Sequence, residues 1–332
     1  MADALRVALL DDYQGVALEL ADWKVLGSGA AVEAFRDHLK DEAALLRRLE
    51  PFDAIVAMRE RTPFPERILA GLPRLRLLVT TGMANASIDV QAATRLGIVV
   101  AGTDGQASPT VELTWALILA AVRRIPQEDR AARAGRWQTS LGAGLEGKVL
   151  GVIGLGRLGS KVAAIGRAFG MRLVAWSQNL TADRAAACGA QLVAKEALLA
   201  QADVVTIHLR LSARTTGLIR AADLARMKRT AYLVNTSRGP IVEEAALIGA
   251  LRNGTIAGAA LDVFDEEPLP PRHPFLSLEN LVLSPHLGYV TRENYGVFYR
   301  GAAADVAAFL RGAPERVLNP DVLTSPALRR RA

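Results

Sequence analysis

The chain has 332 residues, of which 51% are hydrophobic and 22% charged, which suffices for two domains with separate cores and excludes a disordered protein. Its net charge is +6, but the basic residues are scattered and match no nucleic-acid motif, so we expect no nucleic-acid partner. Its single cysteine cannot form a disulfide within the chain. It has no signal-peptide pattern, and its longest apolar run is about half the length that spans a bilayer, so we expect a cytoplasmic protein that does not bind membranes.

Strand-like and helix-like segments alternate along the first hundred residues. Short runs rich in valine, isoleucine and leucine predict strands at 5–11, 52–58, 74–82 and 97–102. Helices are predicted between them, as at 41–50 and 87–97. Strand, helix and strand in series predict a parallel sheet covered by helices.

A second alternating series follows a helix predicted at 109–124 and a polar, turn-rich segment at 130–140. Its strands are predicted at 148–154, 172–176, 203–209, 231–237, 257–263 and 281–285, and another helix at about 293–310. This pattern predicts an α/β fold of two Rossmann-like, doubly wound parallel-sheet domains, one flavodoxin-like and one dinucleotide-binding, with an active-site cleft between them. We predict the dinucleotide-binding domain at 107–290, inserted into a substrate domain of residues 1–106 and 291–332.

A glycine-rich loop links the first strand of the second series to a helix. "VIGLGRLGS" places Gly154, Gly156 and Gly159 in a G-x-G-x-x-G spacing after an apolar strand. Gly154 allows the tight turn, Gly156 lets the backbone approach a pyrophosphate, and Gly159 lets the helix pack close to the strand. The helix N-terminus then offers N–H groups to the phosphates, so the loop predicts a dinucleotide site.

Three later loops of the second series carry residues able to do acid–base or anion chemistry. "VNTSRGPIV" holds Arg238, "LDVFDEEPLP" holds Asp262 and Glu267, and "LSPHLGYVT" holds His286. Each loop follows a predicted strand, and ligands of open parallel sheets bind beyond the carboxyl ends of the strands. We therefore expect these side chains at the same edge of the sheet as the glycine loop.

With the glycine loop, these three loops make the chain resemble the D-isomer-specific 2-hydroxyacid dehydrogenase family over nearly its whole length. It looks like a glyoxylate or hydroxypyruvate reductase, or a phosphoglycerate dehydrogenase without a regulatory domain. The resemblance implies an oxidoreductase that interconverts 2-oxo acids and (R)-2-hydroxy acids by hydride transfer with NAD or NADP, acts as a homodimer, and uses Arg238, Glu267 and His286 in catalysis.

The chemistry of a 2-oxo acid explains these residue types. Hydride delivered to the ketone carbon builds negative charge on its oxygen, and His286 would supply the proton as general acid and base. Glu267 would orient the imidazole and favour its protonated form. The Arg238 guanidinium would grip the substrate's carboxylate and carbonyl oxygens in a fixed fork.

The resemblance also implies binding residues. The cofactor would contact Thr103, Gly154, Gly156, Arg157, Leu158, Gly159, Ser177, Thr236, Asp262, His286 and Gly288. The substrate would contact Met83, Ala84, Arg238 and His286, together with backbone N–H groups of "TTGMANASID". In that segment Ala84 and Ala86 replace a glycine and an acidic residue common in the family. No cluster of histidine and cysteine predicts a metal.

Ser177 bears on which dinucleotide binds. It stands at the end of the second strand, where an acidic residue usually holds the ribose hydroxyls of NAD. Serine removes the repulsion of a 2′-phosphate, yet no arginine follows it directly; Arg157, Arg184 or Arg210 would have to supply the positive charge. We therefore predict a relaxed preference between NAD and NADP.

Several residues keep two interpretations. Arg59 and Arg61 either help to bind an anionic substrate or belong to a solvated charged loop. His208 is interpreted as structural, and His38 and His273 as surface or loop residues.

Two other functions remain open. The chain could be a protein that senses dinucleotides and recruits partners, like the corepressors of this fold, or a relative of formate dehydrogenase.

Overall fold

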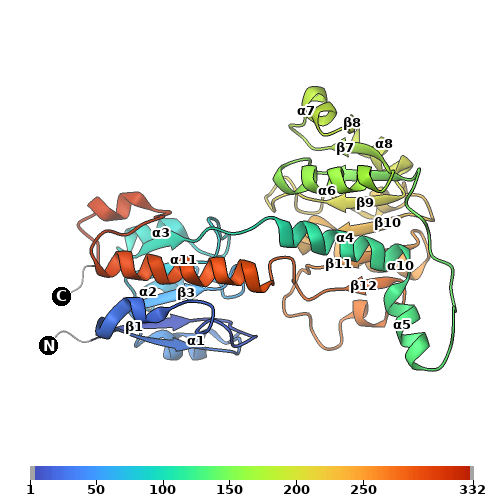
Figure 1. Cartoon of the computed structure of the whole chain (residues 1–332). Helices are drawn as coiled ribbons and strands as arrows, with labels where there is room; N and C mark the ends of the chain where they lie inside the picture. The colour runs from blue at the N-terminus through green and yellow to red at the C-terminus, as the bar shows by residue number, and fades with distance from the viewer. Residues whose placement is uncertain (1–3, 330–332) are drawn as a thin grey trace. The chain divides into compact units, whose positions relative to one another are not determined.

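The computed structural model describes residues 4–329. Two compact units make up this chain, one formed by the described residues up to Gln106 and from Thr291 onward, the other by Ala107–Val290. We call them unit 1 and unit 2 and describe each by itself (Figure 1).

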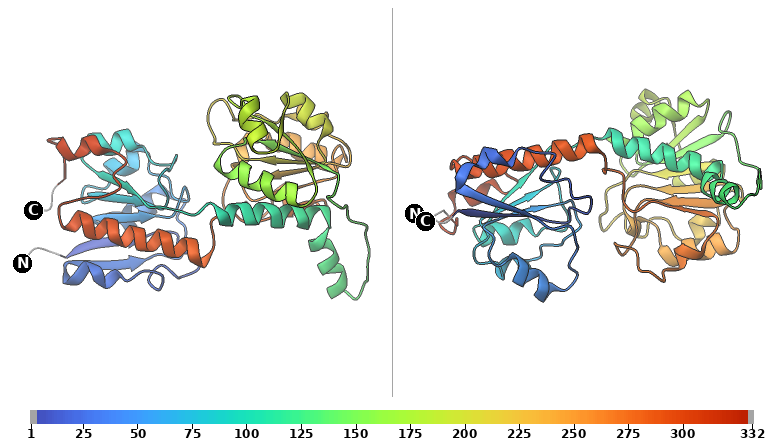
Figure 2. Two further views of the ribbon diagram at one scale, coloured as in Figure 1. Left: turned by 45° about the horizontal axis from the view of Figure 1, so that its top comes forward. Right: turned by 60° about the horizontal axis from the view of Figure 1, so that its bottom comes forward.

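Unit 1 is a five-stranded parallel sheet in the order β2-β1-β3-β4-β5, which is the flavodoxin-like order. Its long helix α11 runs along one face of the sheet and packs on β4 and β5, as two views agree (Figures 1 and 2). Its elements are β1 (Leu5–Leu9), the 3₁₀ helix η1 (Trp23–Gly29), β2 (Ala30–Ala34), α1 (Glu42–Leu49), β3 (Ala54–Ala57), α2 (Glu66–Ala70), β4 (Leu77–Thr80), α3 (Val90–Arg95), β5 (Val99–Gly102), α11 (Arg292–Leu310) and η4 (Pro320–Thr324).

Unit 2 is a seven-stranded parallel sheet in the order β12-β11-β10-β9-β6-β7-β8, with its first strand, β6, between β9 and β7. This is the doubly wound order of dinucleotide-binding domains. Its elements are α4 (Ser108–Val122), α5 (Ile125–Arg133), β6 (Val149–Ile153), α6 (Arg157–Ala168), β7 (Arg172–Trp176), α7 (Ala182–Ala187), β8 (Gln191–Leu192), α8 (Lys195–Gln201), β9 (Val204–Ile207), α9 (Ala221–Leu224), β10 (Tyr232–Asn235), η2 (Gly239–Ile241), α10 (Glu244–Arg252), β11 (Gly258–Leu261), η3 (Pro274–Ser277) and β12 (Leu281–Leu283).

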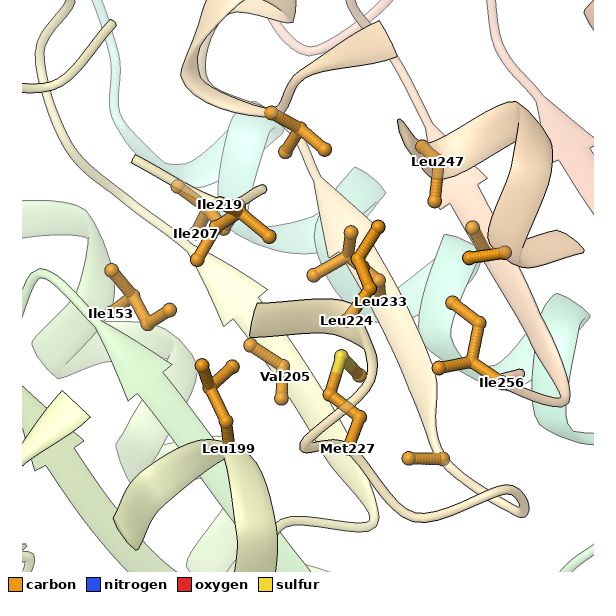
Figure 3. Close-up of a cluster of buried hydrophobic side chains, with 14 of the residues drawn as sticks. Ile153, Leu199, Val205, Ile207, Ile219, Leu224, Met227, Leu233, Leu247 and Ile256 are labelled. Atoms are coloured by element: carbon orange, nitrogen blue, oxygen red, sulfur yellow. The ribbon is translucent and has the colours of Figure 1, made fainter. Parts of the chain in front are cut away.

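The central strands of unit 2 are mostly apolar because both faces of the sheet are covered, and their polar members, Thr206 and Asn235, are buried as well. All five residues of β6 are buried, and successive side chains enter opposite cores. Ile153 lies in the core beneath α8, α9 and α10, in one cluster with Val205, Leu233 and Leu247 (Figure 3). Val152 faces the other way, into the core formed with α4 and α6.

The prediction of a polar turn from residue 130 is wrong for its first part, because α5 continues to Arg133. Arg124 adopts a left-handed backbone (φ 55°) that ends α4, and Pro126 then suits the first turn of a new helix. Asp129 and Arg133 add an i,i+4 ion pair at 3.0 Å. Strands β2 and β8 were not predicted; they lie at sheet edges, where half-exposed residues give no apolar run.

Candidate active site

The glycine loop joins β6 to α6, and each of its glycines meets a different spatial demand. Gly154 has φ +97°, and a Cβ there would lie 2.5 Å from the carbonyl oxygen of His208. A Cβ on Gly159 would collide with the carbonyl oxygen of Gly154. A Cβ added at Gly156 would have no described atom within 4 Å apart from those of the adjacent residues in the chain. No side chain caps the N-terminus of α6. The loop is therefore tight at both ends and open in the middle, which fits a pyrophosphate at the helix N-terminus.

Replacing Gly159 by alanine is expected to weaken cofactor binding, because α6 must move away from the Gly154 carbonyl to admit a methyl group. We expect the Kd for NADH to rise about tenfold or more, as read from quenching of protein fluorescence. The matched control is Gly249→Ala in α10, where no described atom beyond that helix and the neighbouring residues lies within 4 Å of the new Cβ. That variant should bind NADH normally; equal Kd values for both variants would contradict the role of Gly159.

His286 and Glu267 contact each other beyond the carboxyl end of β12. The imidazole Nδ1 lies 2.6 Å from Oε2 of Glu267, and the side chains are 22% and 33% exposed. The second oxygen, Oε1, accepts the backbone N–H of Phe264 at 2.9 Å. A carboxylate at Nδ1 fixes the proton on that nitrogen, so Nε2 is the atom that can exchange a proton with a ligand.

Asp262 fixes the backbone turn on which His286 stands. Its buried carboxylate accepts the hydroxyl of Ser284 at 2.6 Å and the N–H groups of Leu287 and Gly288 at 2.7 and 2.9 Å. Burial raises the pKa of Asp262, although these donors and nearby His286 oppose the rise. His286 has φ 55°, so the turn holds it in a left-handed conformation. Ser284 was not predicted as a site residue, although it stands two residues before His286 in "LSPH".

Arg238 follows β10 and precedes η2. The amide of Asn235 braces its loop, accepting the N–H of Ser237 at 3.0 Å and donating to the Arg238 carbonyl at 2.8 Å. The guanidinium donates to the Ser237 carbonyl at 2.7 Å. A Cβ on the next residue, Gly239, would collide with the backbone of Phe264, so the loop of Arg238 lies directly against the segment that leads to Glu267.

Thr236 and Ser177 also lie beyond the carboxyl ends of their strands. The hydroxyl of Thr236 points inward to that of Thr114, 2.9 Å away, so only its backbone is available to a ligand. Ser177 directly follows β7 and is half-buried, and its carbonyl accepts the N–H of Leu180 at 3.1 Å. Arg157, the first residue of α6, is exposed, and Leu158 is half-buried beside it.

Within unit 1, the residues predicted to bind substrate follow β4. Met83 is 49% exposed and Ala84 is exposed. The N–H of Gly82 donates to the hydroxyl of Thr103 at 2.9 Å, so the fully buried Thr103 holds this loop to the end of β5. Its side chain is used internally, which leaves its backbone for any ligand.

Arg59 and Arg61 do not form a solvated charged loop. Arg59 donates to the Thr81 carbonyl at 2.8 Å, and a Cβ on Gly82 would collide with its guanidinium. Arg61 donates to the Asp11 carbonyl at 2.6 Å and lies 4.2 Å above the ring of Tyr13. Both guanidinium groups therefore support the loops at the carboxyl edge of this sheet.

The remaining histidines are structural. His208 lies just after β9, its Nε2 is 2.9 Å from the hydroxyl of Thr206, and burial lowers its pKa to about 4, which keeps it neutral. His38 and His273 lie in loops, one of the two placements predicted for them, and their side chains are only 12% and 13% exposed and contact Asp11 and Glu244. Across residues 4–329, no three histidine, cysteine or acidic side chains are grouped to hold a metal. Over the same range no helix combines the length and apolar character that a membrane span requires.

Comparison with known proteins adds an independent line of argument. The model of the NAD-binding domain of D-isomer-specific 2-hydroxyacid dehydrogenases matches residues 115–288. The glyoxylate reductase of Aeropyrum pernix is 44% identical over 267 residues, covering 77% of this chain and 80% of that protein. The glyoxylate reductase of Korarchaeum cryptofilum is 37% identical over 300 residues, covering 86% and 90%. A solved structure from Ralstonia solanacearum, described as a putative D-3-phosphoglycerate dehydrogenase, has a TM-score of 0.92 and 38% identity, covering 98% of this chain and 99% of that one.

Proposed function

The chain belongs to the D-isomer-specific 2-hydroxyacid dehydrogenase family, and on this premise we propose that it interconverts small 2-oxo acids and (R)-2-hydroxy acids with a nicotinamide dinucleotide. The observation that carries the proposal is the 2.6 Å contact between His286 and Glu267 on the sheet that also carries the open glycine loop. A carboxylate-held histidine is the acid–base group that reduction of a ketone requires.

We assign unit 2 to the dinucleotide and unit 1 to the substrate. The glycine loop would hold the pyrophosphate, with Arg157 and Leu158 on the first turn of α6. The other contacts to the dinucleotide would come from Ser177, Thr103, Gly288 and the backbone of Thr236. Asp262 would shape the turn near the nicotinamide. Bound dinucleotide supplies or accepts the hydride.

The chain's own residues would move the proton and orient the substrate. His286 gives a proton from Nε2 to the carbonyl oxygen in reduction and takes it back in oxidation. Glu267 holds the imidazole in orientation through Nδ1. Arg238 binds the carboxylate and the carbonyl oxygen, and the exposed loop with Met83 and Ala84 offers backbone N–H groups to the carboxylate.

The direct test mixes the purified chain with NADH or NADPH and a panel of 2-oxo acids that includes glyoxylate, hydroxypyruvate and larger acids. Absorbance of the reduced nicotinamide should fall with at least one acid, and the product should be the R enantiomer by chiral chromatography. No turnover with any member of the panel would refute the proposal. NADH-dependent capture of a partner together with negligible turnover would favour the corepressor-like alternative, which the comparisons do not favour.

We expect the preference between NADH and NADPH to stay within about tenfold in kcat/KM, which corresponds to about 1.4 kcal/mol. Ser177 neither repels a 2′-phosphate nor supplies a positive charge. Ser177→Asp should lower kcat/KM for NADPH and spare NADH, whereas the uncharged control Ser177→Asn should preserve the ratio. A hundredfold preference in the unmodified chain would contradict the relaxed specificity.

A homodimer is also proposed, as is a cytoplasmic location. The segments that we propose for the interface are the helix predicted at 109–124 and residues 130–138. The first corresponds to α4, which is mostly buried within unit 2. The second contains Trp137, which is 81% exposed, and on either side of it Ile125 and Leu141 are 55% and 95% exposed. Size-exclusion chromatography with light scattering tests the assembly, and a monomer at micromolar concentration would count against it.

A further inference from the structure

Two segments of unit 2 carry the proposed catalytic side chains. The first runs from β10 through η2 into α10 and holds Arg238. The second joins β11 to β12 and holds Glu267, which contacts His286. They touch at the Gly239–Phe264 backbone contact, and apolar side chains of both segments, Val242 and Leu247 from the first and Phe264 and Phe275 from the second, belong to one core cluster.

A second carboxylate–histidine pair joins the same two segments. His273, in the β11–β12 segment, has its Nε2 3.0 Å from Oε1 of Glu244, the first residue of α10. The two side chains are only 13% and 25% exposed. Nδ1 of the ring accepts the backbone N–H of Phe275 at 3.3 Å, so the ring proton lies on Nε2 and is donated to Glu244.

The pair connects to the catalytic histidine through packed rings and one backbone bond. The ring centroids of His273 and Phe275 are 4.8 Å apart, and those of Phe275 and Phe264 are 6.2 Å apart. Both phenylalanines are buried. The N–H of Phe264 in turn donates to Glu267, whose other oxygen contacts His286. A shift of the His273 anchor would therefore move Phe264 and with it the carboxylate that orients the imidazole.

The surroundings favour this contact. Asp265 lies in the same segment, and burial together with the nearby charge of Glu244 raises its pKa. Glu244, Asp265, Phe264 and Phe275 line one small cavity beside the Arg238 loop. Two acidic side chains close together repel each other, so the His273 N–H donor offsets a repulsion that would otherwise part the segments.

We propose that His273 and Glu244 are positioning residues for the reaction proposed above, which fix the segment of Glu267, the partner of His286, against the segment of Arg238. Neither residue touches the reacting atoms. Their contact sets the relative position of the acid–base pair and the guanidinium, and this inference rests on the proposed function.

The decisive experiment compares two conservative substitutions of His273. The amide nitrogen of glutamine reaches about as far as Nε2, so His273→Gln keeps the bond between the segments. Asparagine reaches only as far as Nδ1, so His273→Asn keeps the bond within the loop and loses the bond to Glu244. Because the bond between His273 and Glu244 joins the segments, we expect His273→Asn and His273→Ala to lower kcat about 10- to 100-fold. We expect the kcat of His273→Gln to stay within about threefold of that of the unmodified chain.

Substitutions of Glu244 should reproduce this pattern. Glu244→Gln keeps an acceptor oxygen and should retain most of the activity, whereas Glu244→Ala should resemble His273→Ala. The Kd for NADH should change less than about twofold in all of them, because the glycine loop belongs to β6 and α6. The control is Lys228→Ala, which removes a 2.9 Å ion pair with Asp203 between the segments that precede β10 and β9. It should leave kcat unchanged.

Hydrogen–deuterium exchange gives a readout that needs no turnover. Peptides covering 262–280 should exchange faster in His273→Ala and His273→Asn than in the unmodified chain, and at the normal rate in His273→Gln and Lys228→Ala. Absence of turnover in the unmodified chain would overturn the proposed function. Three other results would overturn the positioning role instead. They are a kcat of His273→Ala within twofold of the unmodified chain, equal kcat values for the glutamine and asparagine variants, and unchanged exchange in peptides covering 262–280.

Discussion

Replacing His286 by asparagine is expected to lower kcat for reduction of a 2-oxo acid by about 10³-fold, within the range that a positioned general acid contributes. Asparagine is chosen because its amide can still donate to Glu267 in place of Nδ1, so the turn held by Asp262 keeps its partners. What is lost is Nε2, the proton donor. Steady-state rates at saturating NADH and 2-oxo acid measure the effect, and the Kd for NADH should change little.

Glu267→Gln is the companion variant. Glutamine keeps an acceptor oxygen for only one of the two donors, Phe264 N–H and His286 Nδ1, and loses the negative charge, but it leaves Nε2 of His286 in place, so we expect a smaller loss of about 10- to 100-fold in kcat. Because the two side chains act as one unit, the double variant should cost little more than His286→Asn alone. A His286→Asn enzyme that keeps more than a tenth of its kcat would refute His286 as the proton donor.

Replacing Arg238 by alanine is expected to lower kcat/KM for the 2-oxo acid by about 10²–10³-fold, because the substrate loses the paired donors that orient its carboxylate and carbonyl. Arg238→Lys should recover only part of this, since an ammonium group keeps the charge without the fork. Added guanidinium ion should restore some activity to the alanine variant and none to the lysine variant.

The control for this prediction is Arg252→Ala. Arg252 is exposed at the end of α10, so its loss changes the net charge equally and should leave kcat/KM within about twofold. If Arg238→Ala kept the kcat/KM of the unmodified chain, the guanidinium would have no role in binding the substrate.

The sequence predicted the strands of both sheets closely where burial on both faces makes them continuous apolar runs. The strand expected at 172–176 is β7, residue for residue. The edge strand β2 was missed because its residues are alternately half-buried and exposed, and β8 because it has only two residues. The start of α5 depends on one left-handed residue, Arg124, which no periodicity reveals.

The candidate site was predictable as a set of residue types but not as a set of contacts. Arg238, Glu267 and His286 each follow a predicted strand, and the carboxyl ends of parallel strands share an edge. The 2.9 Å bond from Phe264 to Glu267 uses a backbone group, and His273 meets Glu244 across 29 residues, so neither leaves a local pattern. The inward folding of Arg59 and Arg61 likewise depends on carbonyl groups that only the folded loops present.

The insertion of unit 2 into unit 1 has a consequence for how the protein is made. Residues 107–290 are contiguous and can fold as soon as they leave the ribosome. The sheet of unit 1 is synthesised first, yet the helix that packs on β4 and β5, and Asn319, which accepts the N–H of Val100 in β5 at 2.8 Å, emerge about two hundred residues later. During that interval apolar strand faces remain open to wrong partners. We therefore expect nascent chains from which residues 107–290 have emerged, with Thr291 and later residues still inside the ribosome, to engage chaperones through unit 1, while unit 2 already resists proteolysis.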